Sequence, residues 1–348
     1  MIQHNNPAAV PAGRVMILPT TRAAIVGIAG TTLGAHEAAL FRAYPPAGVI
    51  LFRRNIADPA QLRLLVAALR AVLPPAAVMM LDQEGGRVAR LRPPHWPAHP
   101  AAAAIGALAP PHALRAAWLH GALIGLQCAE AGFDTICAPV LDRRVPGASD
   151  VIGDRAFAES PAEVARLARA MAAGLLAAGV QPVGKHAPGH GRATMDSHLA
   201  LPTVTANDMD ADLLPFAANA DLPWLMTSHI LYPVWDATRP ATLSPEIIEQ
   251  IIRGHCGFRG VLVSDDLAMQ ALDGPPQARA TAALAAGCDL ALYCPGDEAG
   301  TEAVLAAIPT LTPAARARLA AARAMAAQRA VPLDAAALTA ERRRLLAA

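Results

Sequence analysis

The sequence is poor in lysine. Among its 348 residues 29 are basic, and only one of these, Lys185, is a lysine, which leaves 28 arginines. An ammonium and a guanidinium differ in shape, hydration and donor geometry. A composition that uses arginine almost everywhere therefore marks Lys185 as a position that needs the compact ammonium, with chance as the alternative interpretation.

The sequence also lacks an excess of either charge. Its 29 Lys+Arg against 28 Asp+Glu give a formal net charge of +1. Binding to nucleic acid through bulk electrostatics needs a basic excess or stripe, so we expect no nucleic-acid partner. Hydrophobic residues make up 54% of the chain, which excludes a disordered protein.

Cysteines are few, and none lies in a CxxC pattern. They are Cys128, Cys137, Cys256, Cys288 and Cys294. An odd, scattered set indicates buried thiols in a reducing compartment instead of a disulfide framework. The longest stretch without a charged residue, 93–114, contains six prolines and three histidines, which is incompatible with a membrane span. We therefore expect a cytoplasmic protein with no membrane partner.

Eight short apolar runs alternate with segments of helical composition. Near-continuous runs of Val, Ile, Leu and Met are typical of strands buried on both faces of a parallel sheet. The predicted strands are Ala23–Gly30, Gly48–Phe52, Ala77–Leu81, Asp134–Val140, Gly179–Gly184, Pro223–Thr227, Gly260–Val263 and Cys288–Tyr293.

Capping residues predict where several of the intervening helices begin. Asp58 precedes Pro59–Val72, Ser160 precedes Pro161–Ala178, Ser244 precedes Pro245–His255, and Asp297 or Gly300 opens a helix before Ile308. Eight strand–helix units predict an α/β fold, a single TIM-type (β/α)8 barrel, with an open doubly wound sheet as the alternative. We expect one domain over residues 1–348. Its core would cover about residues 20–310, with extra C-terminal helices on the barrel exterior over 311–348.

Polar residues follow five of the predicted strands. They are Asp82–Arg90, then Asp142 with Gly153–Arg155, then Lys185–Gly191 with Asp196–His198, then Ser228–His229, and finally Ser264–Asp266. Barrel active sites are assembled at the C-terminal ends of the strands, so we expect an active site from these segments.

The residue types in these segments favour acid–base and nucleophilic chemistry. Asp196 is two residues from His198 and can accept its ring N–H, which leaves the other nitrogen free for proton transfer near neutral pH. Asp265 ends a buried strand and suits nucleophilic attack or cation stabilisation. A zinc site on His186, His190 and His198 is disfavoured by their spacing. The pair Asp265–Asp266 lacks a clear third carboxylate for a divalent metal.

The sequence contains neither a Gly-rich phosphate-binding loop nor a dinucleotide fingerprint. We therefore expect no cofactor and no metal.

Four blocks of the sequence resemble glycoside hydrolase family 3, and within it the single-domain bacterial β-N-acetylhexosaminidases. The blocks are 48–55 (GVILFRRN), 81–90, 185–198 (KHAPGHG…DSH) and 260–269 (SDDLAM at its end). The runs 152–157 and 240–244 extend the resemblance, which spans about residues 20–295.

The resemblance implies a retaining, two-step mechanism in a (β/α)8 barrel. Asp265 matches the nucleophile, and His198, oriented by Asp196, matches the general acid/base. The residues implied in binding the sugar hydroxyls are Asp82, Arg90, Arg155, Lys185 and His186. Larger family members that act on β-glucosides take their acid from a second domain, for which this chain has no room.

The implied activity is removal of non-reducing terminal β-linked N-acetylglucosamine from peptidoglycan fragments, in cell-wall recycling. The expected partner is a small glycan or muropeptide, and the expected state a monomer. A β-glucosidase or a phosphorolytic relative is the alternative enzyme, and a catalytically silent sugar-binding barrel is the alternative outside enzymes. Two positions depart from the family pattern, namely Ala187, where phenylalanine is usual, and Arg54.

Overall fold

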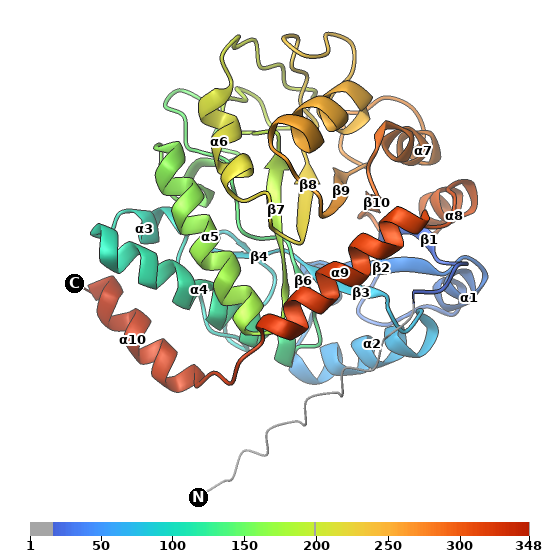
Figure 1. Ribbon diagram of the computed structural model, residues 1–348. Helices are drawn as coiled ribbons and strands as arrows, with labels where there is room; N and C mark the ends of the chain where they lie inside the picture. The colour runs from blue at the N-terminus through green and yellow to red at the C-terminus, as the bar shows by residue number, and fades with distance from the viewer. Residues whose placement is uncertain (1–16, 198–199, 348) are drawn as a thin grey trace, which may run out of the picture.

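The computed structural model describes residues 17–197 and 200–347 (Figure 1), and eight parallel strands close into a barrel within them. The strands, in barrel order, are β1 (Arg22–Val26), β10 (Leu290–Tyr293), β9 (Val261–Asp266), β8 (Trp224–Thr227), β7 (Gln181–Ala187), β6 (Thr135–Ile136), β3 (Val78–Leu81) and β2 (Pro46–Leu51). Each predicted run contributes one strand, and closure excludes the open sheet. The α/β barrel prediction is confirmed.

The strand ends differ from the predicted ends in ways that matter for the site. β7 continues three residues beyond the predicted Gly184, so Lys185 and His186 belong to a strand and not to a loop. β9 likewise continues to Asp266. Backbone within the closed sheet is held by neighbours on both sides, so these polar side chains project from a fixed support.

Helices surround the barrel. They are α1 (Ala35–Ala43), α2 (Pro59–Val72), α3 (Ala102–Gly106), α4 (Pro110–Glu130), α5 (Pro161–Ala177), α6 (Asp210–Ala218), α7 (Pro276–Ala286) and α8 (Glu298–Ala307). The predicted caps are present. Asp58 accepts N–H groups of the first turn of α2 at 2.8 and 2.9 Å, and Asp297, not Gly300, caps α8. The segment Ile247–His255 forms a π-helix.

The C-terminal helices are α9 (Pro313–Arg329) and α10 (Ala335–Ala347). α10 lies outside the barrel against α4, held by Arg115, which donates to both oxygens of Glu341 at 2.8 and 2.7 Å. α9 differs from the expected exterior helix. Its residues Leu319 and Ala322 join the apolar cluster inside the barrel, and it closes the N-terminal end (Figure 1).

A short hairpin that was not predicted follows β3. It pairs β4 (Gln83–Gly85) with β5 (Val88–Ala89), and Gln83 secures it by accepting the N–H groups of Arg90 and Leu91 at 2.7 and 3.1 Å. Gly85 and Gly86 form its turn with φ of 97° and 56°. A Cβ atom on Gly85 would lie 2.3 Å from the Pro100 carbonyl oxygen, so glycine is needed here for both backbone and space.

None of the helices within the described ranges has the length and apolarity of a membrane-spanning segment.

Candidate active site

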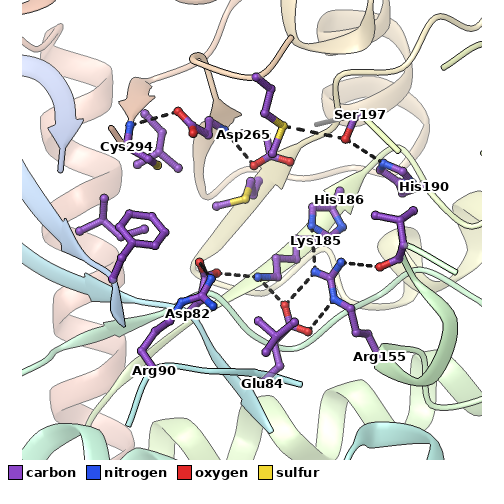
Figure 2. A pocket seen from close by; sticks show the side chains of 18 residues that line it. Asp82, Glu84, Arg90, Arg155, Lys185, His186, His190, Ser197, Asp265 and Cys294 are labelled. Atoms are coloured by element: carbon purple, nitrogen blue, oxygen red, sulfur yellow. Dashed lines mark hydrogen bonds and ion pairs between the residues drawn. The ribbon is translucent and has the colours of Figure 1, made fainter. Parts of the chain in front are cut away.

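A pocket with a volume of about 160 Å³ opens at the C-terminal ends of the barrel strands (Figure 2). It brings together six of the residues predicted from the sequence, namely Asp82, Arg90, Arg155, Lys185, His186 and Asp265. It also contains Glu84, His190 and Ser197, to which no role was assigned from the sequence.

Lys185 lies at the centre of a buried charge cluster. The residue is 2% exposed, and its Nζ lies 2.9 Å from Asp82 Oδ1 and 2.7 Å from Glu84 Oε1. Two of the three ammonium N–H groups are therefore directed at carboxylates. At most one N–H group therefore remains for a ligand.

Two arginines complete the cluster from either side. Arg90 donates to Asp82 Oδ2 at 3.0 Å, and Arg155 donates through Nε and Nη2 to the two oxygens of Glu84, both at 2.9 Å. Burial opposes ionisation of both carboxyls, but the neighbouring cations outweigh it. They hold the pKa of Asp82 well below its usual range and that of Glu84 at about 2. Both carboxylates are therefore ionised at neutral pH.

Asp142 organises the histidines of the pocket. Its Oδ2 lies 2.6 Å from His186 Nδ1, and its Oδ1 accepts the backbone N–H of His190 at 2.6 Å. The other ring nitrogen of His186, Nε2, faces Arg155 Nη2 at 3.4 Å. Asp142 and Arg155 thus contact the two ring nitrogens of His186 and fix the orientation of the imidazole.

His190 contacts the segment that the sequence assigned to proton transfer. Its Nε2 lies 3.3 Å from Ser197 Oγ, and burial together with the nearby His186 lowers its pKa to about 4. Ser197 lines the pocket. The predicted acid/base, His198, lies outside the described residues, while Asp196 lies within them.

Asp265 and Asp266 end β9 with different surroundings. Asp265 is 8% exposed, lines the pocket and accepts the N–H of Asp266 at 2.8 Å. Burial alone would raise its pKa, but His186 and His229 outweigh burial and hold the pKa below its ordinary value. Asp266 instead accepts the backbone N–H groups of Ala268 and Cys294, each at 3.0 Å. Both hydrogen bonds are accepted by Oδ1, so this oxygen of Asp266 is occupied by the backbone.

Other residues singled out from the sequence have structural surroundings. His229 is fully buried, with its ring nitrogens 2.8 Å from Thr242 Oγ1 and 2.9 Å from the Asp266 carbonyl oxygen. Arg54, one of the unusual positions, donates to the carbonyl oxygens of Ile28 and Cys294 and so joins the chain after β1 to the end of β10. Ala187, the other, is buried at the end of β7.

The sequence reasoning placed Glu84 and Asp142 in the polar segments of the expected site but assigned no role to either. Glu84 could have been found from its spacing, since residues i and i+2 of an extended chain share a face, and Asp82 was already assigned to the site. That inference required the hairpin, which was not predicted. The role of Asp142 could not be predicted locally, because its partners are 44 and 48 residues further along the chain.

An ionised carboxylate at the end of a barrel strand, beside a dense cluster of polar donors and acceptors, is typical of a barrel enzyme that acts on glycosides. Residues 26–329 match the family model described as glycosyl hydrolase family 3 N terminal domain. The chain therefore belongs to glycoside hydrolase family 3 and is a glycoside hydrolase.

Individual relatives cover most of the chain. The chain is 41% identical over 304 residues to a beta-hexosaminidase of Alkalilimnicola ehrlichii, and this alignment covers 85% of the chain and 86% of the relative. A beta-hexosaminidase of Pseudomonas aeruginosa is 42% identical over 300 residues, with 84% and 88% covered. The crystal structure of NagZ from Neisseria gonorrhoeae in complex with N-trifluoroacetyl-D-glucosamine is 32% identical, with a TM-score of 0.74, and covers 90% of this chain and 100% of that one.

Proposed function

We propose that this enzyme is a retaining β-N-acetylhexosaminidase that removes non-reducing terminal N-acetylglucosamine through a glycosyl-enzyme intermediate. The observation that carries the proposal is the state of Asp265. This carboxylate lines the pocket, and its pKa is held below the ordinary value. Unlike Asp82 and Glu84, it forms no salt bridge with lysine or arginine within residues 17–197 and 200–347. It is thus free to attack an anomeric carbon.

The surroundings of the other carboxylates support an acid of a different type. A glycosidase needs a group that still carries a proton near neutral pH. Asp82 and Glu84 are held ionised by their cations. Burial raises the pKa of Asp266, but its Oδ1 accepts two backbone N–H groups, which hold this carboxyl group in place. We therefore assign proton transfer to His198, oriented by Asp196. Its neighbour Ser197 lines the pocket, which supports this assignment.

The proposed reaction has two steps. A carboxylate oxygen of Asp265 bonds to the anomeric carbon while the glycosidic C–O bond breaks, and His198 gives its proton to the leaving oxygen. Water then attacks the same carbon, its proton goes to His198, and the bond to Asp265 breaks. The two inversions restore the β configuration.

The charge cluster would bind the sugar hydroxyls. Ionised carboxylates accept O–H groups, and Arg90 Nε is a buried donor without a partner within the described residues. We assign hydroxyl binding to Asp82, Arg90, Arg155, Lys185 and His186, and add Glu84, which shares the pocket with them.

For the substrate we propose N-acetylglucosaminyl-1,6-anhydro-muramoyl peptides, as part of peptidoglycan recycling. We further propose a monomeric, cytoplasmic protein. The beta-hexosaminidase relatives and the glucosamine derivative bound to NagZ support the sugar preference. Release of N-acetylglucosamine from purified anhydro-muropeptides tests the substrate, and light scattering tests the monomer.

The first experiment compares hydrolysis of p-nitrophenyl β-N-acetylglucosaminide with that of the β-glucoside, each with and without phosphate. We expect turnover of the first only, independent of phosphate. Preference for the glucoside would favour the glucosidase alternative, and glycosyl phosphate as product would favour phosphorolysis. Absence of turnover on both sugars would refute the enzymatic proposal.

A second experiment tests the nucleophile. A fluorinated N-acetylglucosamine analogue should label the wild type and Asp266→Asn, but not Asp265→Asn, because we assign the ester to Asp265. Labelling that survives in Asp265→Asn would place the nucleophile elsewhere. His198→Ala should slow substrates with poor leaving groups much more than activated ones, and equal losses on both would argue against its acid role.

A further inference from the structure

A second cavity lies outside the barrel, between α2, α4, α10 and the segment 95–99. Its volume is about 320 Å³, against about 160 Å³ for the active-site pocket. The apolar part of its wall is formed by Leu62, Trp96, Leu123 and Leu126. The polar lining residues are Arg63, His95, His99, Gln127, Glu130, Thr339 and Arg342. A volume of this size is at the lower end of small-molecule sites.

Arg342 is a buried cation without an anionic partner. The residue is 7% exposed, and it forms no salt bridge with any residue in the part of the chain that the structure describes. Its one hydrogen bond there runs from Nη1 to His99 Nδ1, at 2.8 Å. A buried charge of this kind is costly unless it is paired, so the position suits an anionic partner that residues 17–197 and 200–347 do not supply.

The hydrogen bonds of this cluster have a fixed direction. Arginine can only donate, so His99 Nδ1 accepts and the proton of the neutral ring lies on Nε2. That N–H donates to Gln127 Oε1. The Gln127 amide nitrogen then has no acceptor among the described residues, although it is buried. The cavity therefore presents unused N–H groups of Arg342 beside its apolar residues, whereas the Gln127 amide nitrogen is enclosed and out of reach of a ligand.

We propose that this cavity is a second ligand site, separate from the sugar pocket, that binds a small monocarboxylate with an aromatic or branched apolar body. The carboxylate receives N–H groups from Arg342, and the apolar body packs against Trp96 and Leu126. A carboxylate matches both features, because it supplies the missing negative charge and accepts hydrogen bonds at two oxygens.

The site lies directly behind the hairpin that carries Glu84. The carbonyl oxygen of His99 accepts the N–H of Gly86 at 2.9 Å, and His120 Nε2 lies 2.8 Å from the Glu84 carbonyl oxygen. A ligand on Arg342 would thus lie one hydrogen bond from His99, whose carbonyl oxygen holds the turn of that hairpin.

Calorimetric titration of the full chain with hydrocinnamate and with its neutral amide tests the proposal. We expect saturable binding of the acid at one site and binding of the amide at least tenfold weaker, since hydrogen bonds to a charged group are lost. Arg342→Gln should weaken hydrocinnamate binding about tenfold or more. The matched variant Arg343→Gln, at the exposed neighbouring position, should bind as the wild type does.

A second pair of variants blocks the cavity without touching Arg342. Ala335 lines the cavity and is exposed, while Ala336 is exposed and does not line it. Ala335→Trp should abolish binding and Ala336→Trp should not. The proposal is overturned if hydrocinnamate shows no saturable binding or if the amide binds equally well. It is also overturned if binding persists in Ala335→Trp, which would place the ligand elsewhere, including the sugar pocket.

Discussion

The ion pair between Lys185 and Glu84 allows a quantitative test of the charge cluster. Its atoms are 2.7 Å apart, and at an effective dielectric constant of about 20 this distance sets an upper bound of about 6 kcal/mol. The net coupling is smaller, because Glu84 keeps its two hydrogen bonds from Arg155 and buried charges lose hydration. We expect a coupling free energy of about 2 kcal/mol, within the range of neighbouring residues in one network.

The assay is a double-mutant cycle on the free energy of unfolding in urea, with Lys185→Met, Glu84→Gln and the double variant. Lys185→Met alone should cost about 3 kcal/mol, because it leaves two buried carboxylates with one fewer cation. Arg169→Met is the control, since its pair with Asp221 is exposed and such pairs contribute at most about 1 kcal/mol. A coupling free energy below about 0.5 kcal/mol would refute a cluster held together by Lys185.

Three further predictions concern pH, packing and capping. The pKa of Glu84 is lowered from 4.5 to about 2 in the folded protein. Its ionisation therefore contributes fully to the free energy of unfolding above pH 4.5, the pKa in the unfolded chain, and this contribution is lost as the pH falls towards 2. The stability difference between wild type and Glu84→Gln should shrink by up to about 3 kcal/mol from pH 4.5 to pH 2, and a constant difference in urea unfolding would contradict this. Leu319→Ala should lower the free energy of unfolding by about 2–5 kcal/mol, because Leu319 is 7% exposed. Leu64→Ala is the control and should change it very little, because Leu64 is 74% exposed. Equal midpoints of the two variants in thermal unfolding would contradict the role of α9 in the barrel core. Asp58→Ala should cost about 1 kcal/mol and Asp58→Asn much less, and equal losses in urea would exclude the cap.

The barrel could be predicted because its strands are buried on both faces. That burial makes each strand a continuous apolar run, and all eight runs were found. The same criterion placed the ends of β7 and β9 too early, because Lys185, His186 and Asp265 are polar and lie beyond the apolar runs that defined the predicted strands. They belong to strands whose last residues face the pocket and not the apolar interior.

The pairing of site residues could not be predicted in the same way. Asp82, Lys185 and Asp265 were identified individually, since each follows an apolar run. Their partners depend on contacts between distant segments. Lys185 and Asp82 are 103 positions apart in the sequence, and Arg155 reaches Glu84 across 71 positions. A helix that closes the barrel end, as α9 does, is also indistinguishable by composition from an exterior helix.

The single lysine can now be explained by the geometry of the cluster. The charges alternate in the order Arg90, Asp82, Lys185, Glu84, Arg155, and the arginines occupy the two ends, where Arg155 uses its planar fork on both oxygens of one carboxylate. The centre has a different requirement, because one cation must reach two carboxylates at 2.9 and 2.7 Å in a space that is almost fully enclosed. A compact ammonium meets it, whereas a guanidinium is wider and planar. Lys185→Arg should therefore raise the KM for the p-nitrophenyl substrate about tenfold or more while retaining the charge. Unchanged kinetics would show that arginine fits and that the lysine is there by chance.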